Sequence, residues 1–279
     1  MESLTINQAT DSHYAGSIYA SGGAMIVKTG AGRLYLENYN GYTGGTTINA
    51  GAIVAGDNSA LGSGTIKLNG GKLFTENGVT LTNNLNLTAG TLGGFGTFDA
   101  PAALEIGANI ILAPGSIDLK APGTLSFGSN GLVFASNGTY TWQLQSGTGG
   151  EGIGWDWLNV CGPINITATG PSNQFTLALV TLDASGNNGL AGDFNPVFPY
   201  SWLIASASGG ISNFNPNQFS IDPSGFQNSL AGGTFSLSLG GENTELFLNF
   251  NPVPEPSVGA LLAAGLGLLL IGRRRRRRG

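Results

Sequence analysis

Apolar residues recur at a fixed spacing through the first half of the chain. The repeated pattern is an apolar residue, two small or polar residues, a glycine, any residue and a second apolar residue. Copies run from Ile48 to Ile53, from Leu68 to Leu73 and from Leu87 to Leu92, with a looser copy from Leu112 to Ile117 and a further start at Gly123. A period near 20 residues predicts a solenoid, in which each repeat forms one coil and equivalent positions lie above one another.

Each position of the repeat has its own expected role. The apolar residues would line a core that neighbouring coils share, because one coil cannot bury its own apolar face. Gly51, Gly71 and Gly90 would turn a corner with positive φ or let two coils approach closely. Asn49 and Asn69 would stack as a side-chain ladder. A run of imperfect β-hairpins would also separate strands by glycines, but offsets of about 20 residues favour coils.

The same stretch, from about Ala24 to Gly94, resembles the autotransporter-associated β-strand repeat. The resemblance is carried by Lys28-Thr-Gly-Ala-Gly, by Tyr42-Thr-Gly-Gly-Thr-Thr-Ile-Asn-Ala-Gly and by Leu68-Asn-Gly-Gly. It implies a parallel β-helix in a large exported or surface-displayed protein. This family is a structural repeat and provides no catalytic residues to carry over to this chain.

The pattern changes from about Gly128 onward, where strict apolar–polar alternation predicts half-buried strands. Such strands are expected at 139–144, 234–239 and 245–250, and the last two are joined as a hairpin through residues 240–244. Further strands are expected at 155–160, 164–168 and 175–182. Stretches Gly154–Val160 and Phe219–Phe226 resemble the segment that commonly precedes PEP-CTERM tails. We interpret this region as the last, irregular coils of the solenoid and its cap; a separate small β-sandwich is the alternative.

All four tryptophans, Trp142, Trp155, Trp157 and Trp202, lie in this second half. Exposed aromatic rings can form a platform on which sugars stack. Large aromatic side chains more often pack cores, and we expect core packing and coil capping here.

The last 28 residues consist of three blocks. Residues 252–257 hold three prolines within five positions, which form a stiff spacer because proline joins neither a helix interior nor a central strand. Residues from Val258 to Ile271 are uncharged and rich in Leu, Ala and Gly. As a helix this run would be about 21 Å long, against a hydrocarbon core of about 30 Å. A basic stop follows, formed by Arg273, Arg274, Arg275, Arg276, Arg277 and Arg278.

This order of blocks resembles the PEP-CTERM sorting signal, whose Pro-Glu-Pro stands here at Pro254, Glu255 and Pro256. The resemblance implies export across the inner membrane of a double-membraned bacterium. It also implies processing by an exosortase, a membrane-embedded cysteine transpeptidase that removes the tail near the Pro-Glu-Pro. The arginines would be held on the cytoplasmic side. An ordinary C-terminal membrane anchor is the alternative for this tail.

Composition and charge narrow the function classes. The chain has 47 glycines in 279 residues, yet 41% of its residues are hydrophobic, which indicates many short strands and tight turns and argues against disorder. The tail holds one of the 16 acidic residues and six of the 11 basic ones, so residues 1–250 carry 15 acidic against 5 basic residues, a formal charge of −10. Such a body is not expected to bind nucleic acid through its phosphates.

The N-terminal sequence Met1–Ile6 has no basic region and no apolar region, so no secretory signal is visible. Because the tail implies export, we hypothesise that the given start is internal and that a signal peptide lies upstream.

Residues that carry chemistry are few. His13 is the only histidine and Cys161 the only cysteine, so neither a Ser-His-Asp nor a Cys-His arrangement is expected, and Cys161 is expected to be a buried, inert thiol. Residues 183–193, from Asp183 to Asp193, are rich in oxygen ligands suited to Ca²⁺ but miss the EF-hand pattern, and a polar surface turn is the plainer interpretation. No cofactor is expected.

The sequence thus predicts an all-β chain: a right-handed parallel β-helix or solenoid with irregular C-terminal coils or a cap, followed by a short apolar helix. Its expected parts are a lead-in at 1–23, solenoid repeats at 24–127, a C-terminal β region at 128–250 and the sorting tail at 251–279. The expected function is that of an exported, non-catalytic structural or adhesive protein of the cell surface or extracellular matrix. Its expected partners are exosortase, transiently the inner membrane, and an exopolysaccharide. The alternative is a β-helix polysaccharide lyase or hydrolase, which would need Arg or Lys, or two carboxylates, together in a groove.

Overall fold

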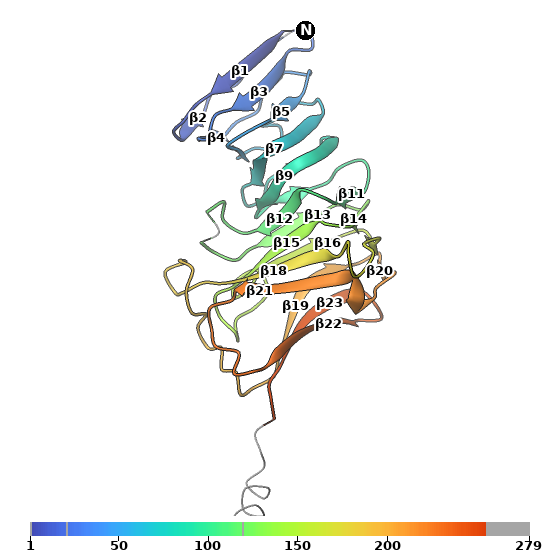
Figure 1. Cartoon of the computed structure of the whole chain (residues 1–279). Coiled ribbons are helices and arrows are strands. Elements are labelled where there is room, and N and C mark those ends of the chain that lie inside the picture. Colours follow the sequence, from blue (N-terminus) through green and yellow to red (C-terminus); the bar gives the residue numbers. More distant parts are fainter. Residues whose placement is uncertain (1, 21, 119, 255–279) are drawn as a thin grey trace, which may run out of the picture.

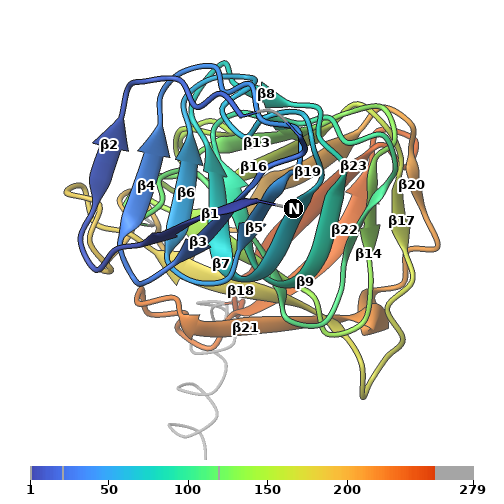
Figure 2. The ribbon, with the colours of Figure 1, turned by 90° about the horizontal axis from the view of Figure 1, so that it is seen from above.

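A computed structural model describes residues 2–20, 22–118 and 120–254. Within these residues the strands stack from the N-terminal to the C-terminal end of the molecule as successive coils (Figure 1). Seen along the stack, the strands form the walls of the coils and enclose the core between them (Figure 2). The solenoid architecture expected from the repeats is therefore confirmed.

The first and longest wall of the solenoid is a parallel sheet. In its early coils the sheet has two columns of strands, one that contains β3 and β5 and one that contains β4 and β6. The two columns join at the long strand β7, which pairs with both β5 and β6. The strands of this wall are β1 (Ser3–Asn7), β2 (Ser12–Tyr14), β3 (Met25–Thr29), β4 (Arg33–Leu36), β5 (Thr46–Ile48), β6 (Ala52–Ala55), β7 (Ile66–Thr75), β9 (Leu85–Gly94), β12 (Ile110–Pro114), β15 (Thr139–Leu144), β18 (Phe175–Thr181) and β21 (Phe219–Gly225).

Two further walls complete the coils. The second contains β8 (Thr80–Leu81), β10 (Thr97–Phe98), β13 (Thr124–Phe127), β16 (Trp157–Val160), β19 (Tyr200–Ala207), β22 (Thr234–Gly240) and β23 (Glu245–Asn251). The third contains β11 (Leu104–Ile106), β14 (Leu132–Phe134), β17 (Ile164–Ile166) and β20 (Ile211–Ser212). One short 3₁₀ helix, Pro216–Gln218, precedes β21.

The strand register confirms the repeat alignment for the first three copies. Ile48 pairs with Leu68, and Leu68 pairs with Leu87, so equivalent apolar residues lie directly above one another. Ile48 and Leu68 are fully buried. The expected asparagine ladder is also present, since Asn69 Nδ2 donates to Asn49 Oδ1 over 3.1 Å.

The alignment of the looser fourth copy was wrong. Leu112 pairs with Leu92, the second apolar position of the preceding copy, and not with Leu87, the first. The parallel ladder between β9 and β12 runs from Gly90 to Gly94, so the fourth copy pairs with the second half of β9 and has slipped by one column of the first wall relative to the sequence pattern. A six-residue pattern with two apolar ends cannot distinguish the two positions, because both face the core.

The corner glycines agree with expectation, two through positive φ and Gly71 through a close approach of coils, since a Cβ there would lie 2.5 Å from Ile48 Cγ2. Gly51 and Gly90 have positive φ, at 65° and 129°. In the middle copy Gly70, with φ of 120°, takes the left-handed conformation in place of Gly71. A glycine pair lets the turn fall on either residue, because neither has a Cβ that would forbid it.

The change of pattern near Gly128 marks a change of coil length. Leu112 pairs with Tyr140, Tyr140 with Leu177, and Leu177 with Ile221, at separations of 28, 37 and 44 residues. The ladder nevertheless stays parallel and continuous through this region. The added residues form the third wall and the loops, so the second half consists of larger coils of the same stack.

The stack begins upstream of the first recognisable repeat. β1 pairs in parallel with β3, and β2 with β4, so the lead-in already forms a coil. At the other end β19 pairs with β23 in the antiparallel sense, and β23 pairs with β22. The predicted hairpin around residues 240–244 is therefore confirmed, and it closes the last coil as a cap.

Within the described residues, the main core is a continuous cluster of buried residues that extends from Leu34 to Phe250. In its wider, C-terminal part aromatic side chains fill the space, and Trp142, Trp155 and Trp202 are all buried. Core packing of the tryptophans is confirmed for these three. Trp157 is half-buried, because it points away from the core between the inward-facing Asp156 and Leu158.

Candidate functional site

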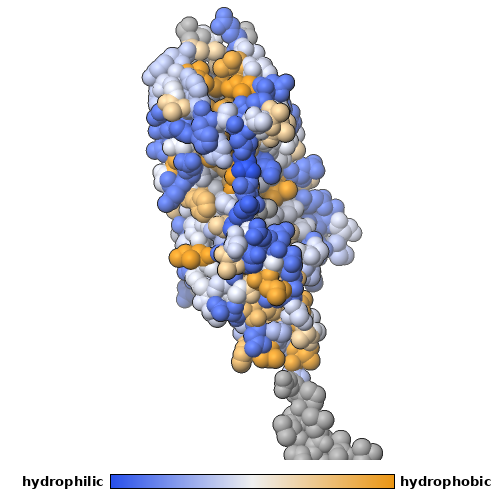
Figure 3. Space-filling view, turned by 90° about the vertical axis from the view of Figure 1, so that its left-hand side faces the viewer, coloured by the Kyte–Doolittle hydropathy of each residue, from blue (hydrophilic) through white to orange (hydrophobic). Residues whose placement is uncertain are grey.

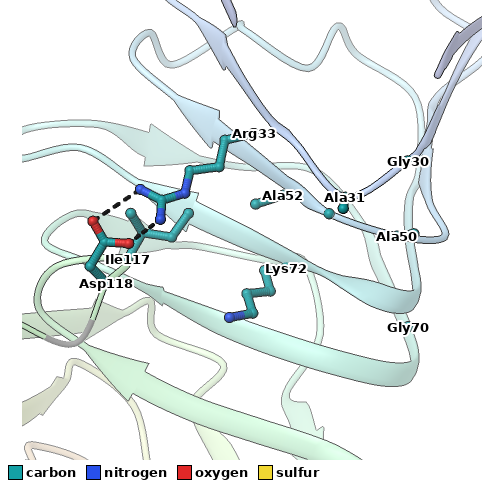
Figure 4. Close-up of a pocket in the computed structure, with 10 residues that line it drawn as sticks. Gly30, Ala31, Arg33, Ala50, Ala52, Gly70, Lys72, Ile117 and Asp118 are labelled. Carbon is teal, nitrogen blue, oxygen red and sulfur yellow. Dashed lines mark hydrogen bonds and ion pairs between the residues drawn. The ribbon is translucent and has the colours of Figure 1, made fainter. Parts of the chain in front are cut away.

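A groove of 620 Å³ lies on the outer face of the early coils, where the loop after β12 folds back over β4, β6 and the second half of β7 (Figure 4). Its lining consists of Gly30, Ala31, Arg33, Ala50, Gly51, Ala52, Gly70, Lys72, Ile117 and Asp118. Most of these residues are glycine or alanine, so the floor of the groove is largely backbone.

The groove follows directly from the strand register. Arg33, Ala52 and Lys72 occupy the same outward-facing position on three successive strands. The alanine between the two long basic side chains leaves a hollow that a larger residue would fill. Each basic residue immediately precedes a core leucine, Leu34 or Leu73, and strand alternation therefore turns it outward.

An ion pair joins the loop to the strands. Both terminal nitrogens of Arg33 donate to the carboxylate of Asp118, with Nη1 lying 3.1 Å from Oδ2 (Figure 4). Arg33 Nε lies 3.6 Å from Asp11 Oδ2. The hydrogen bond from Arg33 lowers the pKa of Asp118, and the same contact raises the pKa of the guanidinium. The pair is therefore fully charged at neutral pH.

Beneath the loop lies a small apolar cluster, separate from the main core. Val54, Phe74 and Ala113 are buried there, with Tyr35 and Ile117 packed against them. Outward-facing residues of a sheet are normally solvated, and here the loop covers them. The ion pair and this cluster together hold the loop in place.

The groove has little capacity for hydrolysis. Glycoside hydrolases use two carboxylates on either side of the bond that breaks, and Asp118 is the single carboxylate among the lining residues of this groove. Arg33 and Lys72 are the residue types that a uronate lyase needs, but Arg33 is already engaged by Asp118 and Asp11. The arrangement suits weak binding of an anionic group at Lys72 better than bond cleavage.

A second, smaller hollow of 250 Å³ lies at a corner of the coils and is lined by tyrosine, asparagine, serine, threonine and glycine residues from the loops after β4, β6 and β8. Its asparagines are structural. Asn40 Nδ2 donates to Ala60 O over 2.6 Å, and Asn83 Nδ2 donates to the carbonyls of Gly62 and Gly64 over 2.9 Å. These bonds fix the corners of neighbouring coils, because each side chain satisfies backbone groups of the coil beside it.

The expected sorting tail lies almost wholly outside the described residues. Pro254 is exposed and is the last of the three described residues that follow β23. Glu255, Pro256, the apolar run from Val258 to Ile271 and the arginines from Arg273 to Arg278 are outside the described part. Within the described residues, no helix is long and apolar enough to cross a membrane.

The expectation of a buried Cys161 was wrong, since this thiol is exposed. Leu158 and Val160 face the core from β16, and the two-residue period of a strand therefore turns residue 161 outward. Its backbone N–H donates to Phe127 O over 2.9 Å and ends the ladder there. A position next to a buried strand was not sufficient to predict burial.

His13 lies on β2, within the first coil. Its ring stacks on Tyr35 with centroids 4.1 Å apart, and Nδ1 lies 2.7 Å from Glu37 Oε1. These contacts occupy the side chain in joining two adjacent strands.

The oxygen-rich stretch from Asp183 to Asp193 forms a turn. Asp183 Oδ1 accepts from the backbone N–H groups of Ser185 and Asn187, over 2.8 and 3.0 Å. Asp193 Oδ2 accepts from Ser146 and Thr148 hydroxyls. In the part of the chain that the structure describes, no three acidic, histidine or cysteine side chains gather as metal ligands.

Sequence reasoning did not identify the groove. Arg33 and Lys72 are nearly two repeats apart, yet each directly precedes the second apolar residue of its coil, and this shared offset could have placed them in one column. Asp118 could not have been placed, because it belongs to the copy whose alignment slipped.

Comparison with known families gives one match. Residues 26–55 match the model of the passenger-associated-transport-repeat, and these residues cover β4 to β6 and all of β3 except Met25. The match supports the resemblance to the autotransporter-associated β-strand repeat. A search of curated proteins found no match. A repeat of this kind implies a secreted or surface-exposed protein.

Proposed function

We propose that this protein is an exported, non-catalytic structural or adhesive component of the cell surface or extracellular matrix, sorted by an exosortase through its C-terminal tail. The observation that carries the proposal is the continuous parallel stack from β1 to β21, closed by the β22–β23 hairpin directly before the tail begins. A stack of this kind forms a stiff rod, because each coil is bonded along its length to both neighbours.

The non-catalytic part of the proposal rests on how the charged side chains of the groove are engaged. The carboxylate of Asp118, the acidic residue that lines the groove, accepts hydrogen bonds from Arg33. An enzyme of the polysaccharide lyase or hydrolase class would need such groups free to reach the substrate. The test is incubation of the purified protein with neutral and uronate-containing polysaccharides. We expect no new reducing ends or unsaturated sugars; their release, abolished by Asp118→Asn, would establish an enzyme instead.

The sorting part rests on the tail sequence, in which Pro254, Glu255 and Pro256 precede the uncharged run and the arginines. The test is the intact mass of the protein recovered from membrane, surface and matrix fractions of its host. We expect a chain that ends near the Pro-Glu-Pro in surface or matrix material. A matched pair of variants sharpens the result: Glu255→Ala should retain the arginines and remain in the membrane fraction, whereas Pro252→Ala should be processed normally.

Recovery of the wild-type chain with all six arginines, from the inner membrane alone, would contradict sorting and leave the tail as a plain anchor. An exopolysaccharide partner is part of the same proposal. It is tested by co-sedimentation of the body with polysaccharide from the host matrix, for which a lack of binding would argue for a purely structural role.

A further inference from the structure

Exposed large apolar side chains gather at the C-terminal end of the body. In the described residues Phe198, Val253 and Val197 are exposed there, at 58%, 55% and 50%. Isolated apolar side chains on a surface need no explanation, but a group at one end of a molecule does. Figure 3 shows apolar side chains at the end of the body from which the tail leaves.

Strand pairing places these three residues at one edge of the cap. β19 and β23 are antiparallel and Tyr200 pairs with Phe250, so the residues before Tyr200 and those after Phe250 emerge together. Val197 and Phe198 lie just before the first, and Val253 lies just after the second. The loop before β22 reaches the same edge, since a Cβ at Gly232 would lie 3.2 Å from Val253 Cγ2.

Two further loops, 145–154 and 183–199, are bonded to this edge through residues 147, 192 and 193. Gly147 N donates to Gly192 O over 2.8 Å, and Trp202 Nε1 donates to Gly147 O over 3.0 Å. Tyr200 Oη donates to Asp193 O over 2.9 Å. The 145–154 and 183–199 loops are thus held on the start of β19.

The apolar tips rest on a rigid base. Phe194 packs against Phe226 and Phe250, with ring centroids 5.1 Å apart in each pair, and Tyr200 stacks on Trp202 at 5.1 Å. The exposed apolar side chains therefore cannot turn inward to join the core, because these aromatic rings already fill the space beneath them.

The sequence beyond the cap sets how far this end can lie from the apolar run. Four peptide units separate Pro254 from Val258. Fully extended, they span at most about 14 Å. The interfacial layer of a bilayer is itself about 5–8 Å deep on each side. If residues 258–271 enter a bilayer, the edge that carries Val197, Phe198 and Val253 lies at its surface.

We infer that, while the tail is inserted, this end of the body docks on the lipid bilayer with Val197, Phe198 and Val253 in the interfacial layer. The inference rests on the membrane stage of the proposed function. The same loops carry the acidic residues Glu151, Asp183 and Asp193, so electrostatic attraction to anionic lipid headgroups does not drive the contact. The contact is made by the apolar side chains. These carboxylates disfavour an anionic surface, so the occupant is a zwitterionic lipid surface, and the rod stands upright on it.

The test uses the full chain with Cys161→Ser and one new cysteine labelled with an environment-sensitive fluorophore. Val197→Cys reports on the proposed contact and Lys67→Cys, on the outer face of β7, serves as the control. With phosphatidylcholine vesicles we expect a blue shift and protection from aqueous iodide at position 197 and no change at position 67. Adding Phe198→Ser should weaken the protection, whereas Tyr19→Ser, at an aromatic residue in the first coil that is even more exposed, should leave it intact.

The outcomes separate the two proposals. If the protein floats with the vesicles but position 197 is quenched by iodide as readily as position 67, docking of the body is wrong and insertion of the tail stands. If the protein does not float with the vesicles at all, both the docking and the membrane stage are overturned.

Discussion

At the scale of single residues, the most unusual side chain is Lys28. It lies in the inward-facing column between Ile6 and Ile48 and is fully buried. Its ammonium donates to Thr29 O, Gly30 O and Ala50 O over 2.7, 3.0 and 3.5 Å. Backbone carbonyls at two successive corners thus receive a donor, and the lysine bridges neighbouring coils.

We expect Lys28→Met to destabilise the protein by about 2–3 kcal/mol, because methionine preserves the apolar volume but leaves the buried carbonyls without their charged donor. Urea unfolding measures the loss. Lys67→Met, at an exposed position of β7, is the matched control and should change the free energy of unfolding by less than about 0.5 kcal/mol. Equal stability of the two variants would show that the buried ammonium contributes nothing.

The pH dependence of the free energy of unfolding gives a second test of the role of Lys28. Burial lowers the pKa of Lys28 from its ordinary 10.5. Between the lowered value and 10.5 the unfolded chain therefore binds more protons than the folded one, and the contribution of Lys28 to stability rises with pH across this window. We expect the stability difference between wild type and Lys28→Met to increase as the pH approaches 10.5. A difference that is constant with pH would contradict a lowered pKa.

Glycine substitutions separate backbone strain from steric clash. At Gly51, φ is 65° and an added Cβ would lie 2.4 Å from Gly30 O and 2.8 Å from Lys28 Nζ. Gly78 has a φ of 80°, but an added Cβ would have no atom within 4 Å. Gly150 has neither a positive φ nor an atom within 4 Å of an added Cβ. We expect Gly150→Ala to be neutral, Gly78→Ala to cost about 1 kcal/mol, and Gly51→Ala to cost several times more. Thermal unfolding of the three variants gives the order, and a cost at Gly51 no larger than at Gly78 would rule out the close approach.

At the scale of elements, the loop after β12 is the feature that departs most from a regular coil. It covers Val54, Phe74 and Ala113 and is tied down by Asp118 and Arg33. The groove exists because this loop returns to an earlier part of the stack, 85 residues back along the chain. A loop held by one exposed ion pair and a small apolar cluster is expected to open more readily than the strands beneath it.

We expect Asp118→Asn to speed trypsin cleavage after Lys120, in the same loop, by about two- to fivefold. An exposed ion pair contributes about 0.4–1 kcal/mol, and cleavage follows the population of the open loop when opening is fast. Mass spectrometry of timed digests identifies the site. Glu242→Gln, in the turn of the cap hairpin, should leave the rate unchanged, and a rate for Asp118→Asn equal to that of wild type would mean that the apolar cluster alone holds the loop.

At the scale of the whole molecule, the stack has two different ends. The C-terminal end is closed by the antiparallel hairpin, in which Leu248 pairs with both Trp202 and Leu237 and is fully buried. At the N-terminal end, Leu4 on β1 is 49% exposed. A terminal coil that buries its own apolar face, as the hairpin does, prevents further coils or other chains from adding at that end.

We therefore expect Leu248→Asp to release the cap and produce oligomers, because β19 would lose its antiparallel neighbour and Trp202 its cover. Size-exclusion chromatography with light scattering detects the change. Ser238→Asp, on the exposed face of β22, introduces the same charge without touching the core and should remain in the wild-type state. A monomeric, cooperatively unfolding Leu248→Asp variant would show that the hairpin is not needed as a cap.

The sequence by itself determined the features that depend on local periodicity. The stacking of Ile48, Leu68 and Leu87 can be predicted from their spacing, because every coil must place an apolar side chain at the same position of the shared core. The Asn49–Asn69 ladder and the β22–β23 hairpin follow from the same regularity or from the alternation of adjacent strands. The three blocks of the tail are likewise features of the sequence, and all of the tail beyond Pro254 lies outside the described residues.

Only the tertiary structure decided the features that depend on where the coils change length. The slip of Leu112 onto Leu92, the outward direction of Cys161 and the return of Asp118 to Arg33 each depend on how a longer coil fits onto a shorter one. A periodic pattern carries no information on this, because inward positions on different walls look alike in sequence. The groove and the apolar edge of the cap arise from contacts between distant parts of the chain, which the strand register and the return of the loop after β12 bring together.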